Sequence, residues 1–424
     1  MKAISYVPHG AVPDLRGNAP AIVAQEFVRH FRLVAPHTVC DREIYTNAFE
    51  IERDYGPIHR LRVGRVYRRL FQKITRLDPY PLHARAACIA DRVGADVFHA
   101  HQLEFPVADF LRRTHRRPTV LVHMHVYRTL KEELGVADCY VAVSEYARRR
   151  SIEERGYPTE RVVVVHNGVD TERFRPPLPD ERVALRAVLG IPPEAVVVSY
   201  VGRKASSKGY LAFLRAMNHL FQKRRDVYGV SVGMITEETR RHDGELEEIV
   251  ALLTELRAHP RFHDFAPIAH VRLPAIYQLS DIVHFATYSD HETFGLVAAE
   301  AQASGCVLLG ARHAAMHEIV RDGVTGFLVP DPRNVDDVID RTENVVDRLE
   351  SLGAMRTAAR AWARQRFDWS VVAQRLERLY FGLVSGEAPA VACPDTYVDG
   401  TGAETHSGDS DCFRPQMESS TPPA

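Results

Sequence analysis

Short runs of β-branched residues alternate with helical patterns along most of this chain, and this alternation limits the folds that it can adopt. In the first half, strands are predicted at residues 3–7, 38–40, 97–99, 119–123, 140–143 and 162–165, with helices between them, for example at 19–31 and 145–154. After a turn signal at 167–170 and a proline-rich stretch at 176–179, the pattern starts again, with strands at 196–201, 230–234, 282–285 and 307–309 and a helix at 210–220. Such alternation is typical of parallel α/β sheets. We therefore expect two α/β domains joined by a linker, with ligands at the carboxyl ends of the strands.

Length and composition agree with a two-domain globular protein. The chain has 424 residues, of which 45% are hydrophobic and 26% are charged. No apolar run approaches the roughly 18 residues of a membrane-spanning helix, and the first apolar run is too short for a signal peptide. The six cysteines are scattered without a C-x-x-C pair, which favours reduced thiols and a cytoplasmic location.

The net charge of −1 conceals an uneven distribution. Residues 1–170 carry 26 Lys and Arg against 20 Asp and Glu, whereas residues 386–424 carry 1 against 7. A mildly basic half without a concentrated basic face does not indicate nucleic acid as a partner. Residues 386–424 are also rich in Pro, Gly, Ser, Thr and Asp, so they are predicted to form a disordered tail.

Two glutamates eight residues apart form the most informative motif of the second half. Glu292 and Glu300 lie on either side of a Phe-Gly step, where a loop is predicted to enter a helix. A helix rises about 1.5 Å per residue, so their carboxylates would lie up to roughly 12 Å apart, beyond the 5–9.5 Å or so of a glycosidase pair. The spacing suits two contacts with one long ligand, with backbone amides between them facing a phosphate, namely those of Phe294, Gly295 and Leu296. The alternative is a solvated loop glutamate and a helix glutamate in a salt bridge.

The motifs that follow point to one family. The two glutamates are followed by residues 303–307, then by Glu318-Ile319-Val320, and then by the run 323–329. In this order the motifs resemble the donor half of the family 4 retaining glycosyltransferases, also called glycosyl transferases group 1. The likeness runs from about residue 1 to residue 385.

The resemblance implies the GT-B fold, in which two Rossmann-like parallel-sheet domains face a cleft. Residues 1–175 would form the N-terminal acceptor domain and residues 176–368 the C-terminal nucleotide-sugar donor domain. Residues 369–385 would form a helix that returns to the N-terminal domain, followed by the tail at 386–424.

A basic turn at residues 202–209 is a candidate anion site. It lacks the residue order of a P-loop, but it is a strand-to-helix turn with Arg, Lys and spare amides; the alternative is an exposed basic turn. The resemblance matches Arg203 and Lys208 to the pair that clamps the donor diphosphate. It also matches Gly17 to a turn where the backbone approaches the donor phosphates, although Asn18 replaces the second small residue that the family usually has.

Two predicted strand ends carry paired histidines, His99 with His101 and His123 with His125. Residues i and i+2 point to the same face of a strand, so four imidazoles near one sheet edge suggest a metal site as the rival chemistry. No Cys or carboxylate ligand has an obvious matching place. The resemblance instead places a histidine against the donor sugar, with His125 the best match and His123 the fallback. No metal and no cofactor are expected.

Two further segments bear on the ligands. Residues 62–77 combine an apolar helical stripe with six basic residues, which is typical of a helix that lies on an anionic membrane or binds a phosphorylated glycolipid; the alternative is a surface helix packed on its own sheet. Ala314 and Ala315 occupy positions where the family commonly has Gly-Gly. Because alanine does not easily adopt positive φ, this loop is expected to be reshaped.

The resemblance implies an enzyme that moves a hexose from a nucleotide-diphosphate sugar to an acceptor hydroxyl with retention at the anomeric carbon. Cell-envelope polysaccharide, lipopolysaccharide or glycolipid synthesis is the commonest setting of such relatives. Glu300 would hold the ribose, Glu292 the sugar hydroxyls, and His125 would line the sugar. The leaving phosphate would take the acceptor proton, so no dedicated protein base is expected. The alternatives are a GT-B nucleotide-sugar epimerase and a nucleotide-sugar-binding protein without catalysis.

Overall fold

The computed structural model describes residues 1–7, 19–41, 49–52, 56–61, 65–75, 82–101, 105–126 and 134–388. Gly17 and Asn18 lie outside these residues, and so does most of the predicted tail, from residue 389 onward. None of the described helices is long and apolar enough to cross a membrane.

The first half of the chain forms an eight-stranded sheet in the order β3-β4-β2-β1-β5-β6-β7-β8. All neighbouring strands are parallel except β3 and β4, which are antiparallel. The strands are β1 (Lys2–Val7), β2 (Ala35–Asp41), β3 (Phe49–Glu52), β4 (Gly56–Leu61), β5 (Val97–Ala100), β6 (Thr119–Met124), β7 (Cys139–Ala142) and β8 (Val162–Val164). The helices are α1 (Ala19–His30), α2 (Arg65–Thr75), α3 (Leu82–Val93), α4 (Val107–Leu111) and α5 (Glu145–Arg155).

The second half forms a six-stranded parallel sheet in the order β11-β10-β9-β12-β13-β14. Its strands are β9 (Val196–Val201), β10 (Val227–Val232), β11 (Phe262–Phe265), β12 (Ile282–Phe285), β13 (Val307–Ala311) and β14 (Phe327–Val329). Its helices are α6 (Pro179–Val188), α7 (Tyr210–Lys223), α8 (Glu237–His242), α9 (Leu246–Arg257), α10 (Leu273–Leu279), α11 (Leu296–Ala303), α12 (Met316–Ile319), α13 (Val335–Asp347) and α14 (Gly353–Phe367).

Hydrophobic residues cover both faces of this second sheet. Val198 packs with residues of α7, α9 and α13, whereas its neighbour Val197 packs with residues of α10, α11 and α14 on the other face. Successive side chains of a strand point to opposite faces, so a strand buried on both sides is apolar at almost every position. This explains why β9 and β12 were predicted with the bounds that they have.

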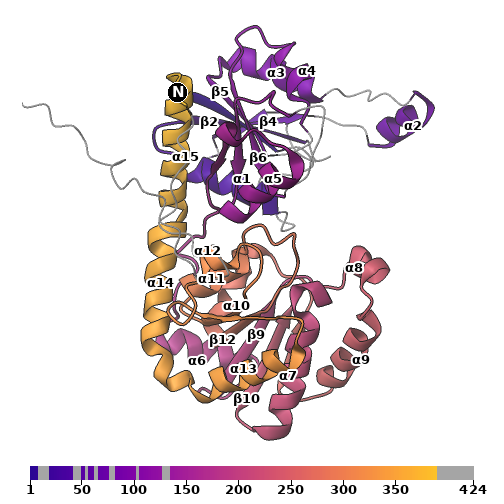
Figure 1. Ribbon diagram of the computed structural model, residues 1–424, viewed down its shortest axis with the longest axis vertical. Coiled ribbons are helices and arrows are strands. Elements are labelled where there is room, and N and C mark those ends of the chain that lie inside the picture. The colour runs from indigo at the N-terminus through magenta and orange to yellow at the C-terminus, as the bar shows by residue number, and fades with distance from the viewer. Residues whose placement is uncertain are drawn as a thin grey trace, which may run out of the picture. The chain divides into compact units, whose positions relative to one another are not determined.

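The last helix, α15 (Trp369–Val384), belongs to the first sheet and not to the second. Trp369, Leu376 and Tyr380 share a buried cluster with Phe27 of α1 and with residues of β1, β5, β6, β7 and β8. Figure 1 shows α15 in yellow beside the first sheet, directly after α14. The predicted return of this helix to the N-terminal domain is confirmed, as is the fold class of two parallel-sheet α/β domains.

The strands that the sequence did not predict lie at or next to the edges of the sheets. β3, β11 and β14 are edge strands, and β4 is the neighbour of β3. β3 and β11 carry charged or polar residues among their aromatic and aliphatic ones, and β14 has only three residues. An edge strand has a partner on one side only, so it needs no continuous apolar run and leaves a weaker signal in the sequence.

Candidate functional site

The loop after β9 is held against the loop after β12 by a glycine. Gly209 has φ +76° and ends a short 3-10 turn, Ser206–Lys208. A Cβ atom at Gly209 would lie 2.5 Å from the backbone oxygen of Ala286, so no other residue fits without a shift of the backbone. The Tyr288 amide also donates to the Ser207 oxygen at 2.9 Å. These contacts place the basic turn beside the segment that carries the first glutamate of the motif.

Lys208 and Glu292 form an ion pair between these two loops. The Lys208 Nζ lies 2.8 Å from Glu292 Oε2, and the two side chains are only 12% and 16% exposed. The residues are 84 positions apart in the sequence. The structure therefore brings together two residues that were predicted for the site separately, one for the diphosphate and one for the sugar.

The other cations of the turn have different partners. Arg203 is 45% exposed, and its Nη1 pairs with Glu238 Oε2 of α8 at 2.8 Å. Lys204, to which no role was assigned, is buried and pairs with Asp264 Oδ1 of β11 at 2.5 Å. Lys204 thus stabilises the sheet edge, while Arg203 remains at the surface of the turn.

α11 begins next to Glu292 with unused backbone donors. Gly295 precedes the helix with φ +93°, and Phe294 is buried against Phe367 with ring centroids 5.6 Å apart. Within the described residues, no group accepts a hydrogen bond from the backbone amides of Phe294, Gly295 or Leu296. The first turn of a helix with free amides favours an anion.

Glu300 lies in α11 with its carboxylate buried. Its Oε1 lies 2.7 Å from His270 Nε2, and its Oε2 accepts a hydrogen bond from the Tyr277 hydroxyl at 2.7 Å. Burial alone would lower the pKa of His270, but the hydrogen bond and the charge of Glu300 outweigh it and raise this pKa above its usual value. The alternative for the two motif glutamates was a solvated loop glutamate and a helix glutamate in a salt bridge. In the structure each glutamate has its own partner, Lys208 for Glu292 and His270 with Tyr277 for Glu300.

His125 lies at the end of β6, next to the motif of the second half. Its backbone oxygen accepts a hydrogen bond from the Thr293 hydroxyl at 2.6 Å, and the Thr293 oxygen accepts one from Ser144 Oγ at 2.6 Å. Burial lowers the pKa of His125 to about 3, so its imidazole is neutral near pH 7. His125 therefore contacts the segment of Glu292 through its backbone, and its uncharged ring packs against His101 and His123.

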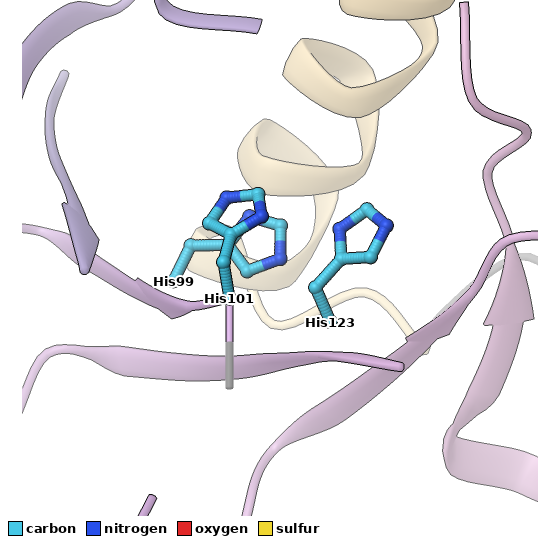
Figure 2. Close-up of side chains that lie close together, drawn as sticks. All are labelled: His99, His101 and His123. Carbon is cyan, nitrogen blue, oxygen red and sulfur yellow. The ribbon is translucent and has the colours of Figure 1, made fainter. Parts of the chain in front are cut away.

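The four strand-end histidines form a stack. Ring centroids are 4.4 Å apart between His99 and His101, 5.0 Å between His101 and His123, and 4.5 Å between His123 and His125, with interplanar angles of 14–30°. Figure 2 shows the rings of His99 and His101 lying over each other, with His123 beside them. The base of the stack reaches α15, since His99 Nδ1 lies 2.6 Å from the Tyr380 hydroxyl.

This geometry does not favour the metal alternative. Each of His99, His101 and His123 offers one ring nitrogen, and these nitrogens lie within 4.8 Å of one another. In a tetrahedral zinc site the ligand nitrogens lie about 3.4 Å apart, as follows from Zn–N distances of about 2.1 Å. The lone pair of an imidazole nitrogen lies in the plane of its ring, so near-parallel rings cannot direct theirs at one point. A metal ion would require the rings to turn.

Glu318 contributes contacts that the sequence did not reveal. Its Oε2 and Oε1 accept hydrogen bonds from the Glu145 and Tyr146 amides at the start of α5, at 2.7 and 2.8 Å. His166 Nε2 lies 3.3 Å from Glu318 Oε2. The residue was part of the family motif, but only the fold shows that its carboxylate occupies the N-terminus of a helix from the other half of the chain.

The loop at Ala314 contains an alanine with positive φ. Ala314 adopts φ +50°, the left-handed conformation that glycine favours, and Ala315 has φ −74°. α12 begins directly after this loop, and its first residue, Met316, is buried. The expectation that alanine would avoid positive φ was wrong here, and the local backbone carries the strain.

Two predictions fall wholly or partly outside the described residues. Gly17 lies outside the described residues. Of the stripe predicted at 62–77, α2 presents Tyr67, Leu70 and Ile74 to solvent with exposures of 54%, 56% and 81%. Three apolar residues of the predicted stripe are thus exposed in α2.

Two families match the chain. Residues 36–173 match the family described as Glycosyltransferase Family 4, and residues 181–362 match Glycosyl transferases group 1. The chain is 26% identical to the lipopolysaccharide 1,2-N-acetylglucosaminetransferase of Salmonella typhimurium over 357 residues, which cover 82% of this chain and 89% of that protein. It is 30% identical to the D-inositol 3-phosphate glycosyltransferase of Corynebacterium aurimucosum over 323 residues, which cover 70% of this chain and 74% of that protein.

Solved structures show the same fold. Anabaena HepE in complex with UDP and glucose is similar with a TM-score of 0.70 and 19% identity, over 89% of this chain and 98% of that one. Sucrose-phosphate synthase from Thermosynechococcus elongatus is similar with a TM-score of 0.71 and 18% identity, over 91% and 100% of the two chains.

Proposed function

Because the chain belongs to the glycosyl transferases group 1 and has the GT-B fold, we propose that it moves a hexose from a nucleotide-diphosphate sugar to an acceptor hydroxyl with retention at the anomeric carbon. Glycosyltransferase activity follows from the family; the hexose, the retention and the acceptor class are the proposed parts. The observation that carries the proposal is the Lys208–Glu292 pair beside the open first turn of α11. A cation, a carboxylate and unused amides meet there, beyond the carboxyl ends of the central strands β9 and β12.

In this proposal the leaving diphosphate is neutralised by Lys208, by Arg203 and by the amides of Phe294–Leu296. Lys208 would turn from Glu292 toward the diphosphate when the donor binds, and Glu292 would then accept hydrogen bonds from the sugar hydroxyls. Arg203 would have to leave Glu238, which is easy because both side chains are well exposed. The acceptor proton would pass to the leaving phosphate, without a protein base or a metal.

Glu300 would hold the ribose. A carboxylate offers about four lone-pair positions, and His270 and Tyr277 occupy two of those of Glu300. Two positions remain for the ribose hydroxyls, so His270 and Tyr277 can stay in place and fix the orientation of the carboxylate. His125 would line the sugar as a neutral imidazole, which suits contact with an uncharged ring.

The acceptor is proposed to be a cell-envelope glycan or glycolipid. The relative named for lipopolysaccharide supports an acceptor of this class. The exposed apolar side chains of α2 support contact of this helix with an anionic membrane, together with its basic residues Arg65, Arg68 and Arg69. Replacing these three arginines with Gln should weaken binding to anionic vesicles, with a smaller effect at high salt, and should spare donor hydrolysis. If the unmodified protein does not bind anionic vesicles, α2 has no membrane role.

A donor panel tests the activity most directly. Nucleotide sugars that differ in base and sugar are incubated with the protein and with lipid-linked or free glycan acceptors, and release of nucleoside diphosphate is measured. An acceptor-dependent release, with product of retained configuration, is expected. Conversion of a donor to its epimer without acceptor would identify an epimerase, and tight binding without any release would identify a binding protein; either result overturns the proposal.

Calorimetry with the nucleoside diphosphate separates the roles of the two glutamates. Glu300→Ala should lower the affinity for nucleoside diphosphate, because the ribose is common to donor and product. Glu292→Ala should change this affinity little and depress turnover. Chelator should leave turnover intact. Equal losses of affinity for both variants would contradict these two roles. Loss of turnover on addition of chelator, restored by a divalent ion, would contradict the metal-independent mechanism.

A further inference from the structure

A cavity of about 630 Å³ lies in the second half of the chain, and none of the residues assigned above lines it. Its walls are the proline-rich linker at Pro176–Pro179, the start of α6, the residues after α11 and one face of α14. A volume of this size accommodates a small metabolite. None of the contacts proposed for the donor involves this cavity.

The described residues of the walls carry four guanidinium groups and no carboxylate. Arg356, Arg360 and Arg364 follow one another at i, i+4 and i+8 on α14, and Arg182 of α6 completes the set; among the lining residues, none is acidic. Residues at this spacing share one face of a helix, so three positive charges point the same way. Like charges at this spacing repel each other, and an anion between them would relieve the repulsion.

The partners of these arginines neutralise only part of this charge. Asp281 lies 2.6 Å from Arg182 Nη2 and 3.4 Å from Arg356 Nη2, and it also pairs with a third arginine, Arg186, at 2.8 Å. Arg360 donates to the Ala303 oxygen at 2.6 Å, and the guanidinium of Arg364 contacts no described hydrogen-bond acceptor. The single carboxylate of Asp281 thus pairs with three arginines, whereas Arg360 and Arg364 have no described carboxylate partner.

Three buried polar atoms of the lining residues have no partner in the described part of the chain. They are Arg182 Nε, Arg356 Nε and the hydroxyl oxygen of Ser304. Ser304 is only 2% exposed. A buried donor without an acceptor is costly, so the described chain leaves hydrogen-bonding capacity unused around this cavity.

We propose that this cavity binds a small molecule that carries a phosphate group, such as a sugar phosphate. Guanidinium groups match the oxygens of a phosphate in charge and in planar geometry, and they bind it through two hydrogen bonds each. The phosphate would lie among Arg356, Arg364 and Arg182, and the Ser304 hydroxyl would donate to an oxygen of the ligand. The apolar linker prolines would cover the rest of the molecule.

The cavity lies between the linker and the C-terminal end of α11. Gly305, which follows α11, has φ +73°, and a Cβ atom there would lie 3.0 Å from Pro176 of the linker. Arg360 holds the last carbonyl of α11, whereas the proposed donor contacts lie at the first turn of the same helix. A ligand here contacts both the linker and the far end of the donor helix.

Calorimetry on the full-length protein tests this site without any measurement of turnover. The probes are a hexose 6-phosphate, inorganic phosphate and the unphosphorylated hexose. The two phosphates are expected to bind and the neutral hexose is not. Arg364→Gln should weaken the binding of hexose phosphate about tenfold, as expected for the loss of one charge-assisted hydrogen bond, and the double variant with Arg356→Gln should weaken it further.

Three comparisons make the result specific. Arg348→Gln removes an exposed arginine of the same half that does not line the cavity, and it should leave binding unchanged. Lys208→Ala should also leave it unchanged, because that residue belongs to the proposed donor contacts. Ser304→Ala should lower the affinity for hexose phosphate while the protein stays folded, since the hydroxyl has no partner to lose.

Several outcomes would overturn the proposal. The first is an absence of phosphate binding at millimolar concentration. The second is binding that Lys208→Ala abolishes and Arg364→Gln spares, which would assign the phosphate to the donor contacts. The third is capture of the protein by vesicles of anionic phospholipid through these arginines, without binding of either soluble phosphate. Failure of the proposed sugar transfer would leave the expected calorimetry unchanged.

Discussion

Removal of the Lys208 amine should damage both stability and turnover, and the structure allows the size of each effect to be worked out. At 2.8 Å and an effective dielectric constant of about 20, the attraction between Lys208 Nζ and Glu292 Oε2 is about 6 kcal/mol before desolvation is counted. Desolvation offsets most of this. Loss of one partner from a fully buried pair costs about 3–5 kcal/mol, and since this pair keeps some exposure we expect about 2–3 kcal/mol for Lys208→Ala.

A double-mutant cycle on urea unfolding isolates the pair. Lys208→Ala, Glu292→Gln and the combination are compared with the unmodified protein, and a coupling energy of at least about 1.5 kcal/mol is expected. The matched control is Lys223→Ala, which breaks a pair with Glu343 at 2.9 Å whose lysine is 51% exposed. That control should change stability by about 0.5 kcal/mol or less.

Turnover supplies the second half of the test. If Lys208 stabilises the leaving diphosphate, its loss should remove about 2–3 kcal/mol of transition-state stabilisation, which is about 30- to 160-fold in kcat/KM. Nucleoside diphosphate release at saturating acceptor measures this value. Additive stability effects together with unchanged kcat/KM would refute both the coupling of the pair and its role in the site.

Four further changes have expected outcomes. Glu377→Ala should destabilise the protein to urea by at least about 3 kcal/mol, because Glu377 Oε1 accepts hydrogen bonds from the backbone amides of residues 32, 33 and 34; an unchanged midpoint would contradict this. Burial, and then the neighbouring imidazoles, lower the pKa values of His99, His101 and His123, and burial lowers that of His125 to about 3. The unfolded chain binds these protons more readily than the folded one. The stability that the stack contributes is therefore complete above about pH 6.5 and is lost as the pH falls below it. Thermal melts should show a melting temperature that declines from pH 7 to pH 5, and His123→Leu should make this decline smaller. Ala314→Gly should raise the unfolding free energy by up to about 1 kcal/mol, since glycine adopts φ +50° without strain, and a loss of stability would show that the alanine methyl group packs usefully. Truncation after Ser385 should leave folding and turnover nearly unchanged, and loss of most activity would assign the tail a part in the site.

The sequence predicted those parts of the molecule that have a continuous local signal. Central strands such as β9 and β12 are buried on both faces, so their apolar runs define their bounds. Lys208 and Glu292 were recognised from motifs, but their pairing was not, because it depends on the contact of Gly209 with Ala286. A spacing rule relates residues of one element, whereas this pair joins two loops that follow neighbouring strands.

The partners of Glu300 illustrate the same limit. His270 is a single histidine at the start of a short 3-10 helix before α10, and nothing in the neighbouring sequence suggests a carboxylate partner 30 residues away. The same holds for Tyr380, which meets His99 only because the last helix packs on the first sheet. Long-range contacts between polar residues follow from the topology, so they become visible only with the fold.

The position of α15 also determines when the N-terminal half of the chain can become stable during synthesis. Domains generally fold as units, N-terminal first, as they leave the ribosome. Here the buried cluster on one face of the first sheet is completed by Trp369, Leu376 and Tyr380, and the end of α1 is held by Glu377. The first domain to be translated therefore needs the last described helix, whereas the second sheet has all of its strands by residue 329. A nascent chain arrested before residue 369 should protect the second sheet from protease and leave the first sheet open to cleavage.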